Sequence, residues 1–148
     1  MLKTGFVAIA IALMGTAAHA AGSGVPAIDR HVTTMRAGDL AGVMADYADN
    51  AVVMTPHGVA PGQKPAGQLD VFAGKTNVRK LFAVLTDKDH NPAVSSMVVQ
   101  FEPRGADTTL MHWTQFPGTP KAVKGMDVFV VRGGKIVFQN VTVEPPKK

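Results

Sequence analysis

The feature of this sequence that most restricts its fold is the segment RGGK, residues 132–135, which separates two runs rich in β-branched and aromatic residues. Two adjacent glycines tolerate the positive φ angles of a tight two-residue turn, so the flanking runs are predicted to form a β-hairpin. Earlier runs of the same kind, 93–102 and 108–116, are separated by turns that contain glycine and proline. The C-terminal half is therefore predicted to be an antiparallel meander.

The N-terminal half has helical periodicity instead. Apolar residues of 26–38 recur at i, i+3, i+4 and i+7, with a proline at the start and a glycine at the end, so a helix is predicted there. Asp39 is a suitable N-cap for a second helix over 40–47. A short strand is predicted over 50–56 and a third helix over 78–85. Helices followed by strands are typical of an α+β domain.

The segment 58–73 holds glycine and proline at short intervals and is predicted to be mainly a loop. The first 20 residues are predicted to be a secretory signal peptide, because an apolar run too short to anchor in a membrane precedes small residues at Ala18 and Ala20. Cleavage after Ala20 would leave a single domain, 21–148, with a short polar C-terminal tail. We expect that domain in the periplasm or outside the cell.

Charge and residue content argue against several classes of function. The formal net charge is +4, and no basic stripe interleaved with aromatic residues is present, so nucleic-acid binding is not expected. The chain contains no cysteine, no HExxH and no GxSxG motif, which argues against disulfides, a zinc-protease site and a serine-hydrolase nucleophile. We expect neither a metal ion nor a cofactor.

Two segments carry a family resemblance: AGDLAGVMADYADNAVV at 37–53 and GMDVFVVRGGKI at 125–136. They resemble the nuclear transport factor 2-like superfamily, in particular its SnoaL-like and ketosteroid isomerase-like branches. The resemblance implies a cone-shaped, curved antiparallel sheet wrapped around N-terminal helices, a cystatin-like α+β barrel with a pocket at its open end. This fold hosts many functions, so the resemblance alone assigns no activity.

The resemblance also implies where the catalytic groups of ketosteroid isomerases would fall. Their general base, an Asp before a Pro, corresponds to Thr55, which is not a base near neutral pH. Their oxyanion hole, a Tyr and a protonated Asp, corresponds to His31 and Asp127. One oxyanion donor is therefore retained in kind, one is replaced, and the base is lost. His57 is the candidate replacement for the base; the alternative is that it points to solvent.

The residues themselves single out the same two polar positions, each with a structural alternative. Asp127 lies in an apolar run, where a carboxyl group is costly unless it is paired or neutral. It either donates a hydrogen bond into the pocket or reaches water at a strand end. His31 lies on the apolar stripe of the first helix, as an acid, base or oxyanion donor, or as a satisfied core residue. An internal ion pair between the two would be purely structural.

Other residues are candidates for contacts with a ligand. They are Tyr47, Thr55, His112, Trp113 and Phe129. Tyr47 has a helical core spacing, which favours packing over ligand contact. His112 and Trp113 point to opposite faces of the same strand, because successive side chains alternate, and the sequence leaves open which face lines the pocket.

Two functions remain open from the sequence. The first is binding of a small, mainly apolar organic molecule with isomerase, cyclase or lyase chemistry next to a carbonyl, in which His31 and Asp127 polarise the oxygen and His57 is the base. The second is a non-catalytic ligand-binding or protein-interaction domain that has lost its general base. A homodimer through the outer face of the sheet is expected in either case.

Overall fold

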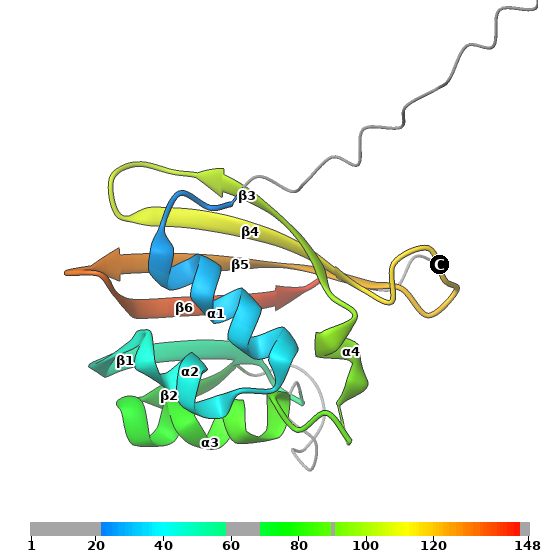
Figure 1. The fold of residues 1–148 in the computed structure, drawn as a ribbon, viewed down its shortest axis with the longest axis horizontal. Coiled ribbons are helices and arrows are strands. Elements are labelled where there is room, and N and C mark those ends of the chain that lie inside the picture. The colour runs from blue at the N-terminus through cyan, green and yellow to red at the C-terminus, as the bar shows by residue number, and fades with distance from the viewer. Residues whose placement is uncertain (1–21, 59–68, 90, 146–148) are drawn as a thin grey trace, which may run out of the picture.

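The computed structural model describes residues 22–58, 69–89 and 91–145, and the predicted signal peptide lies outside these ranges. The predicted α+β architecture is confirmed, with helices in the first part of the chain and most strands in the second (Figure 1). None of the helices in the described ranges is long and apolar enough to cross a bilayer. The elements, in chain order, are α1 (Pro26–Ala37), α2 (Leu40–Ala45), β1 (Tyr47–Pro56), β2 (Leu69–Ala73), α3 (Lys75–Leu85), α4 (Pro92–Ser95), β3 (Val98–Pro103), β4 (Thr108–Gln115), β5 (Val123–Arg132) and β6 (Lys135–Val143).

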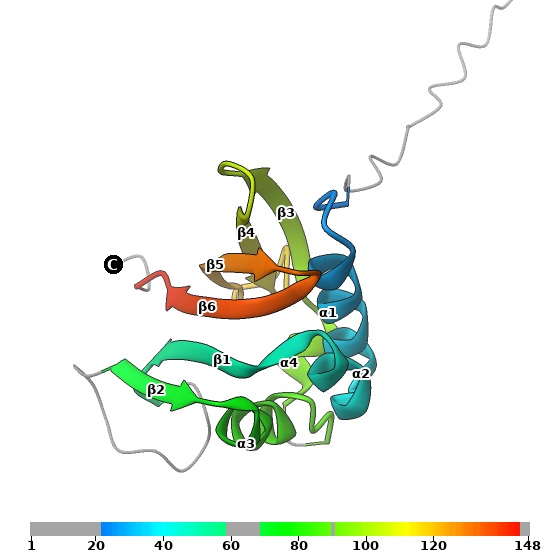
Figure 2. The ribbon, with the colours of Figure 1, turned by 90° about the vertical axis from the view of Figure 1, so that its left-hand side faces the viewer.

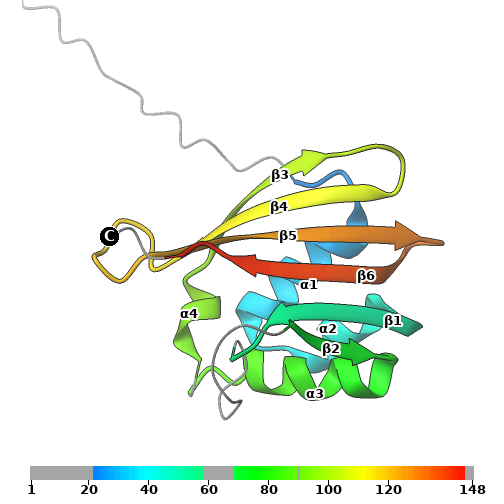
Figure 3. The same ribbon diagram turned by 180° about the vertical axis from the view of Figure 1, so that it is seen from behind.

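The described strands form one curved, open sheet in the order β2-β1-β6-β5-β4-β3 (Figures 1 and 3). The predicted meander is confirmed, because β3, β4, β5 and β6 pair antiparallel in succession. Gly133 and Gly134 form the turn between β5 and β6 with φ angles of 56° and 73°. β1 runs parallel to β6, and β2 pairs antiparallel with β1. Figure 2 shows α1 and α2 against one face of this curved sheet, so the core lies between them.

Helix α1 forms where the sequence predicts it. Pro26 occupies its first turn, and Gly38 ends it with a φ of 70°, a left-handed conformation that favours glycine. A side chain at Gly38 would also approach the Thr86 carbonyl oxygen to 2.9 Å. Asp39 then caps α2 by accepting a hydrogen bond from the Gly42 N–H at 2.9 Å, as predicted. The buried face of α1 includes His31 and Met35, which places both side chains toward the sheet.

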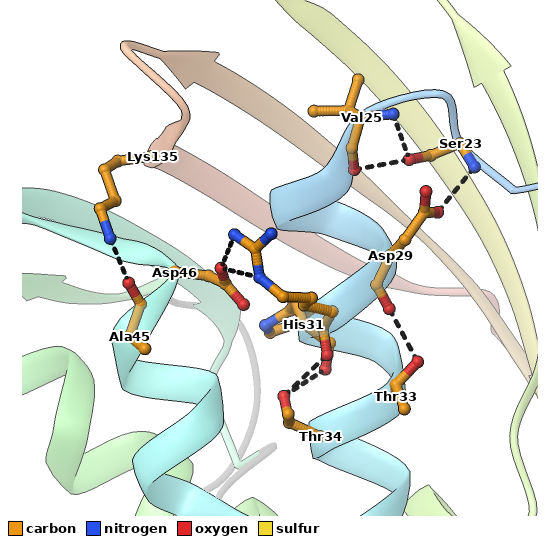
Figure 4. A network of polar contacts seen from close by, with 10 residues as sticks. Ser23, Val25, Asp29, His31, Thr33, Thr34, Ala45, Asp46 and Lys135 are labelled. Atoms are coloured by element: carbon orange, nitrogen blue, oxygen red, sulfur yellow. Dashed lines mark hydrogen bonds and ion pairs between the residues drawn. The ribbon is translucent and has the colours of Figure 1, made fainter.

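A buried carboxylate fixes α1 against the start of β1. Asp46 is 1% exposed and accepts hydrogen bonds from Nε and Nη2 of Arg30, at 2.9 and 2.5 Å (Figure 4). Its backbone carbonyl accepts from the Ile136 N–H at 2.8 Å, and Lys135 Nζ donates to the Ala45 carbonyl at 2.5 Å. These contacts join α1, the α2–β1 junction and the start of β6. They therefore hold the helix that carries His31 at a fixed position over the sheet.

Two sequence predictions for residues 40–73 were wrong. Tyr47 does not belong to the second helix: α2 ends at Ala45, and Tyr47 is the first residue of β1, where it pairs with Ile136 of β6. Pairing with a long neighbouring strand outweighed a helical spacing that only two turns supported. The loop predicted over 58–73 ends early, because Leu69–Ala73 forms strand β2. Residues 59–68 lie outside the described ranges.

Strand β2 was missed because apolar residues lie on both of its sides, so no alternation of apolar and polar residues marks it in the sequence. Leu69 and Val71 are 55% and 58% exposed, whereas Asp70 and Phe72 point inward and are half-buried. An alternating strand usually has apolar side chains on its core side and polar ones on the other. Helix α4, Pro92–Ser95, also occupies the start of a segment predicted to be a strand, because Pro92 favours the first turn of a helix.

Candidate ligand-binding and acid–base site

A cavity of about 410 Å³ lies between the helices and the inner face of the sheet. Most of its wall is apolar, formed by Met35, Leu81, Phe82, Leu85, Val94, Met97, Met111, Val141 and Val143. Its polar wall residues are His31, His57, Asn91, Gln115, Asp127 and Gln139. A hollow of this size with a few polar groups in an apolar wall has the properties of a small-molecule site.

Asp127 is the centre of a hydrogen-bonded chain in this wall. It lies on β5, is 4% exposed, and accepts hydrogen bonds from Trp113 Nε1 on β4 at 2.8 Å and from Gln139 Nε2 on β6 at 2.6 Å. The Gln139 carbonyl oxygen in turn accepts from the Tyr47 hydroxyl. Each neighbouring strand therefore contributes one donor. The orientation of the Asp127 carboxyl group is set by the register of β4, β5 and β6.

Trp113 reaches Asp127 because the residue opposite it is Gly125. The two residues pair across β4 and β5, and a Cβ atom at Gly125 would lie 2.1 Å from Cζ2 of the indole ring. The Thr142 carbonyl oxygen would lie 2.2 Å from the same Cβ atom. Only glycine leaves room for the ring in this position. The GMD sequence of β5 thus supplies both the space for Trp113 and the carboxyl group that it contacts.

Burial makes Asp127 an acid that titrates near neutral pH. Desolvation raises its pKa to about 7, against the opposing effect of the hydrogen bonds from Trp113 and Gln139. The neutral form is therefore well populated at pH 7 and dominates below it. A neutral carboxylic acid can donate a hydrogen bond to a ligand, which a carboxylate cannot.

His31 is buried among aromatic rings. Its ring lies edge-on to Tyr47, Phe82 and Phe129, with centroid distances of 5.6, 5.4 and 5.4 Å. Burial lowers its pKa to about 3, so the imidazole is neutral at physiological pH. Its Nδ1 atom is buried without a hydrogen-bond partner. The structure shows no hydrogen bond or ion pair between His31 and Asp127 within the described residues, although both side chains line the cavity.

His57 lies in the cavity wall just after β1, and a carboxylate on β2 contacts it. Its Nδ1 atom is 2.8 Å from Asp70 Oδ1, and both side chains are 20% exposed. Asp70 pairs with Thr55 across the two strands, so these two side chains are on the same side of the sheet, and His57 lines the cavity just beyond the end of β1. Within the described ranges, no three His, Asp or Glu side chains are arranged to hold a metal ion.

Residues 28–139 match the sequence profile of the SnoaL-like domain. The chain belongs to the SnoaL-like domain family. The predicted superfamily is thereby confirmed. Comparison with curated protein sequences gave no match.

Solved structures similar to this SnoaL-like domain share its fold at low sequence identity. A protein from Sphaerobacter thermophilus is 13% identical with a TM-score of 0.62, over 85% of this chain and 100% of that chain. An NTF2-like protein from Mesorhizobium loti is 16% identical with a TM-score of 0.56, over 81% and 89%. TerC, co-crystallised with polyporic acid, is 15% identical with a TM-score of 0.59, over 83% and 92%. At these identities the similarity establishes the fold alone.

Of the other predicted site residues of this SnoaL-like domain, some line the cavity and others do not. Trp113 lines the cavity, which resolves the two faces of β4. His112 points to the opposite side, exposed and 3.6 Å from Glu102, so it does not line this cavity. Tyr47 and Phe129 are fully buried beside His31 rather than in the cavity wall. Thr55 is also fully buried, with an unpaired hydroxyl group.

Three polar residues of the cavity wall, Asn91, Gln115 and Gln139, were not predicted, and neither was Asp70, which contacts His57. Gln139 is 2% exposed and links Tyr47 to Asp127. An amide side chain within the apolar run IVFQNVTV was the available sequence indication, because a buried amide requires partners. Asp70 was missed because its strand was predicted to be a loop.

Proposed function

We propose that this SnoaL-like domain binds a small, mainly apolar organic molecule whose carbonyl oxygen accepts a hydrogen bond from neutral Asp127. The supporting observation is a buried carboxyl group in the wall of an apolar cavity of about 410 Å³, with its pKa raised to about 7 by desolvation. Such a group is costly for folding, and it is retained where a neutral acid is useful.

The hydrogen-bond chain around Asp127 suits this role. Trp113 and Gln139 donate to the two carboxyl oxygens from neighbouring strands, which holds the group in place without supplying a positive charge. An acid held in this way can add a donor contact to a carbonyl oxygen at little cost in reorganisation. The reaction class that follows is a proton shift next to the carbonyl, as in isomerases, cyclases and lyases, because a donor at the oxygen stabilises an enolate.

The alternative is a domain that binds the same kind of molecule without turnover. The position that corresponds to the isomerase base is Thr55, and this residue is fully buried and absent from the cavity wall. Binding is therefore the part of the proposal that the geometry supports best. Catalysis requires a base elsewhere in the wall.

Trp113, the single tryptophan of the chain, provides the test because its indole lines the cavity and contacts Asp127. Its fluorescence is followed during titration with 2-tetralone, a small ketone, and with tetralin, the hydrocarbon with the same ring system. At pH 6 the ketone is expected to bind about tenfold more tightly than tetralin. This preference should decline above pH 7 in the wild type and be independent of pH in Asp127→Asn, whose amide donates at every pH. Equal binding of the two compounds to the wild type at pH 6 would contradict the proposal.

We also propose that the domain acts as a homodimer after export. The outer sheet face carries an apolar, half-buried patch of Val52, Met54, Val128, Val130 and Phe138, and Figure 2 shows α1 and α2 on the opposite face. Leu69 and Val71 extend it at the β2 edge. An apolar face of this extent favours a second copy of the chain. Export is tested by the intact mass of protein from a periplasmic fraction, which should begin at Ala21.

A further inference from the structure

The cavity wall holds a second polar arrangement, the pair of His57 and Asp70. The two strands bring it together: β1 and β2 are antiparallel, Thr55 is opposite Asp70, and His57 follows two residues later. Both side chains point to the inner side of the sheet. His57 lines the cavity that Asp127 also lines, and Asp70 stands behind it at 2.8 Å.

The contact fixes the chemical form of the imidazole. A carboxylate is only an acceptor, so the Nδ1 atom that contacts Asp70 carries the proton in neutral His57. The lone pair is then on Nε2. The second Asp70 oxygen, Oδ2, is buried and has no hydrogen-bond partner, so the carboxylate is committed to this one contact at a cost in solvation. A histidine whose tautomer is set by a carboxylate is well suited to proton abstraction, because its free lone pair faces away from the carboxylate.

We propose that His57 is the catalytic base of this domain and that Asp70 is its positioning residue, an inference that rests on the carbonyl binding proposed above. Nε2 of His57 takes a proton from the carbon next to the carbonyl. The C–H electron pair forms the C=C bond of the enol, and the carbonyl oxygen receives the proton of Asp127. Return of a proton from His57 to a conjugated carbon, and of the enol proton to Asp127, completes an isomerisation with no co-reactant, whereas return to the same carbon gives proton exchange alone.

This assignment supplies a base although Thr55, at the position of the isomerase base, is not one. His57 lies two residues further along the chain, just after β1, and its partner Asp70 comes from the neighbouring strand β2. A purely structural ion pair between β1 and β2 would share the 2.8 Å contact but would leave proton exchange of a bound ketone unaffected. The chain offers a matched control, because His112 and Glu102 form a second histidine–carboxylate pair, 3.6 Å apart, on the opposite side of the sheet.

The experiment follows deuterium incorporation next to the carbonyl of 2-tetralone in D2O by NMR. The wild type and His112→Gln are expected to accelerate deuterium incorporation by the same factor relative to the rate in buffer without protein. His57→Gln should lose about 100-fold of that acceleration, and Asp70→Asn about tenfold in kcat with KM little changed. Equal rates for wild type and His57→Gln, with 2-tetralone still bound by the fluorescence assay, would overturn the base and leave the binding proposal standing.

A second measurement is independent of any ligand. The ¹⁵N shifts of the His57 ring should show the Nδ1–H tautomer in the wild type, a mixture or the Nε2–H tautomer in Asp70→Asn, and recovery in Asp70→Glu. No change of tautomer in Asp70→Asn would overturn the positioning role, whatever the exchange rates. If 2-tetralone does not bind at all, the carbonyl proposal fails, and the tautomer then decides the role of Asp70 alone.

Discussion

At the scale of single residues, Asp127 and His31 make the stability of the domain depend on pH in opposite directions. Asp127 is protonated in the folded state up to about pH 7 but ionises near 3.8 when unfolded, so its contribution is present below 3.8 and is lost as the pH rises to 7. His31 stays neutral in the folded state down to about pH 3 but takes up a proton below 6.5 when unfolded. Its contribution is therefore lost as the pH falls from 6.5 to 3.

Separate variants should reveal the two effects. The unfolding free energy of the wild type minus that of Asp127→Asn is expected to decrease by on the order of 4 kcal/mol between pH 4 and pH 7. The corresponding difference for His31→Phe should increase by a similar amount between pH 3 and pH 6.5. Urea unfolding over this pH range measures both. A difference that does not depend on pH for either variant would show that the residue keeps its ordinary pKa.

Gly125 is predicted to be essential for the site despite having no side chain. In Gly125→Ala the new Cβ would overlap the Trp113 ring and the Thr142 carbonyl, so the indole must move away from Asp127. We expect a loss of about 2 kcal/mol in stability and a changed indole N–H chemical shift, measured by urea unfolding and NMR. Wild-type stability with an unchanged indole shift would refute the tight contact.

At the scale of elements, the buried end of the Arg30–Asp46 pair holds α1 to the sheet. The Asp46 side chain is 2% exposed and that of Arg30 57%, so removing Arg30 leaves a buried carboxylate without its main partner. Arg30→Met is expected to destabilise the domain by about 2 kcal/mol, and Arg30→Met with Asp46→Asn by less. Lys75→Met is the control, because its partner Asp49 is 98% exposed, and should change stability by less than about 0.5 kcal/mol. Equal effects of the Arg30 and Lys75 variants in urea unfolding would contradict the stabilising role of the Arg30–Asp46 pair.

Sequence patterns predicted those elements whose local preferences agree with their tertiary contacts. Helix α1 has its proline, glycine and apolar stripe, and the hairpin of β5 and β6 has two glycines in the turn. Tyr47 and β2 were mispredicted because long-range pairing decides their structure: Tyr47 pairs with Ile136 of β6, and β2 pairs with β1. No local pattern contains this information.

The residues of the site also fall into those that the sequence indicates and those that only the strand pairing reveals. An aspartate in an apolar run and a histidine on an apolar stripe are visible in the sequence, so Asp127 and His31 were found. The partners of a buried group depend on strand register, which places Gln139 beside Asp127 and Asp70 beside His57. Those partners come from residues 12 and 13 positions away in the chain. They become predictable only once the pairing of β5 with β6 and of β1 with β2 is known.

At the scale of the whole molecule, the outer sheet face predicts the oligomeric state. Phe138 pairs with both Val52 and Val130 and lies near the middle of that face. The wild type is expected to have twice the mass of one chain by light scattering, and Phe138→Glu the mass of one chain, because a buried charge would be unpaired. Lys121→Glu, in the turn between β4 and β5, should stay dimeric. A wild type that is monomeric at micromolar concentration would contradict this interface.

The most direct test of the central claim is the titration of Asp127 itself. The claim is that the fold holds a carboxyl group in an apolar cavity so that its neutral, hydrogen-donating form is well populated near pH 7. The ¹³C shift of the Asp127 carboxyl carbon, assigned by its loss in Asp127→Asn, is followed by NMR against pH. The midpoint is predicted at about pH 7. A midpoint near 4, the ordinary value for an aspartate, would contradict the account.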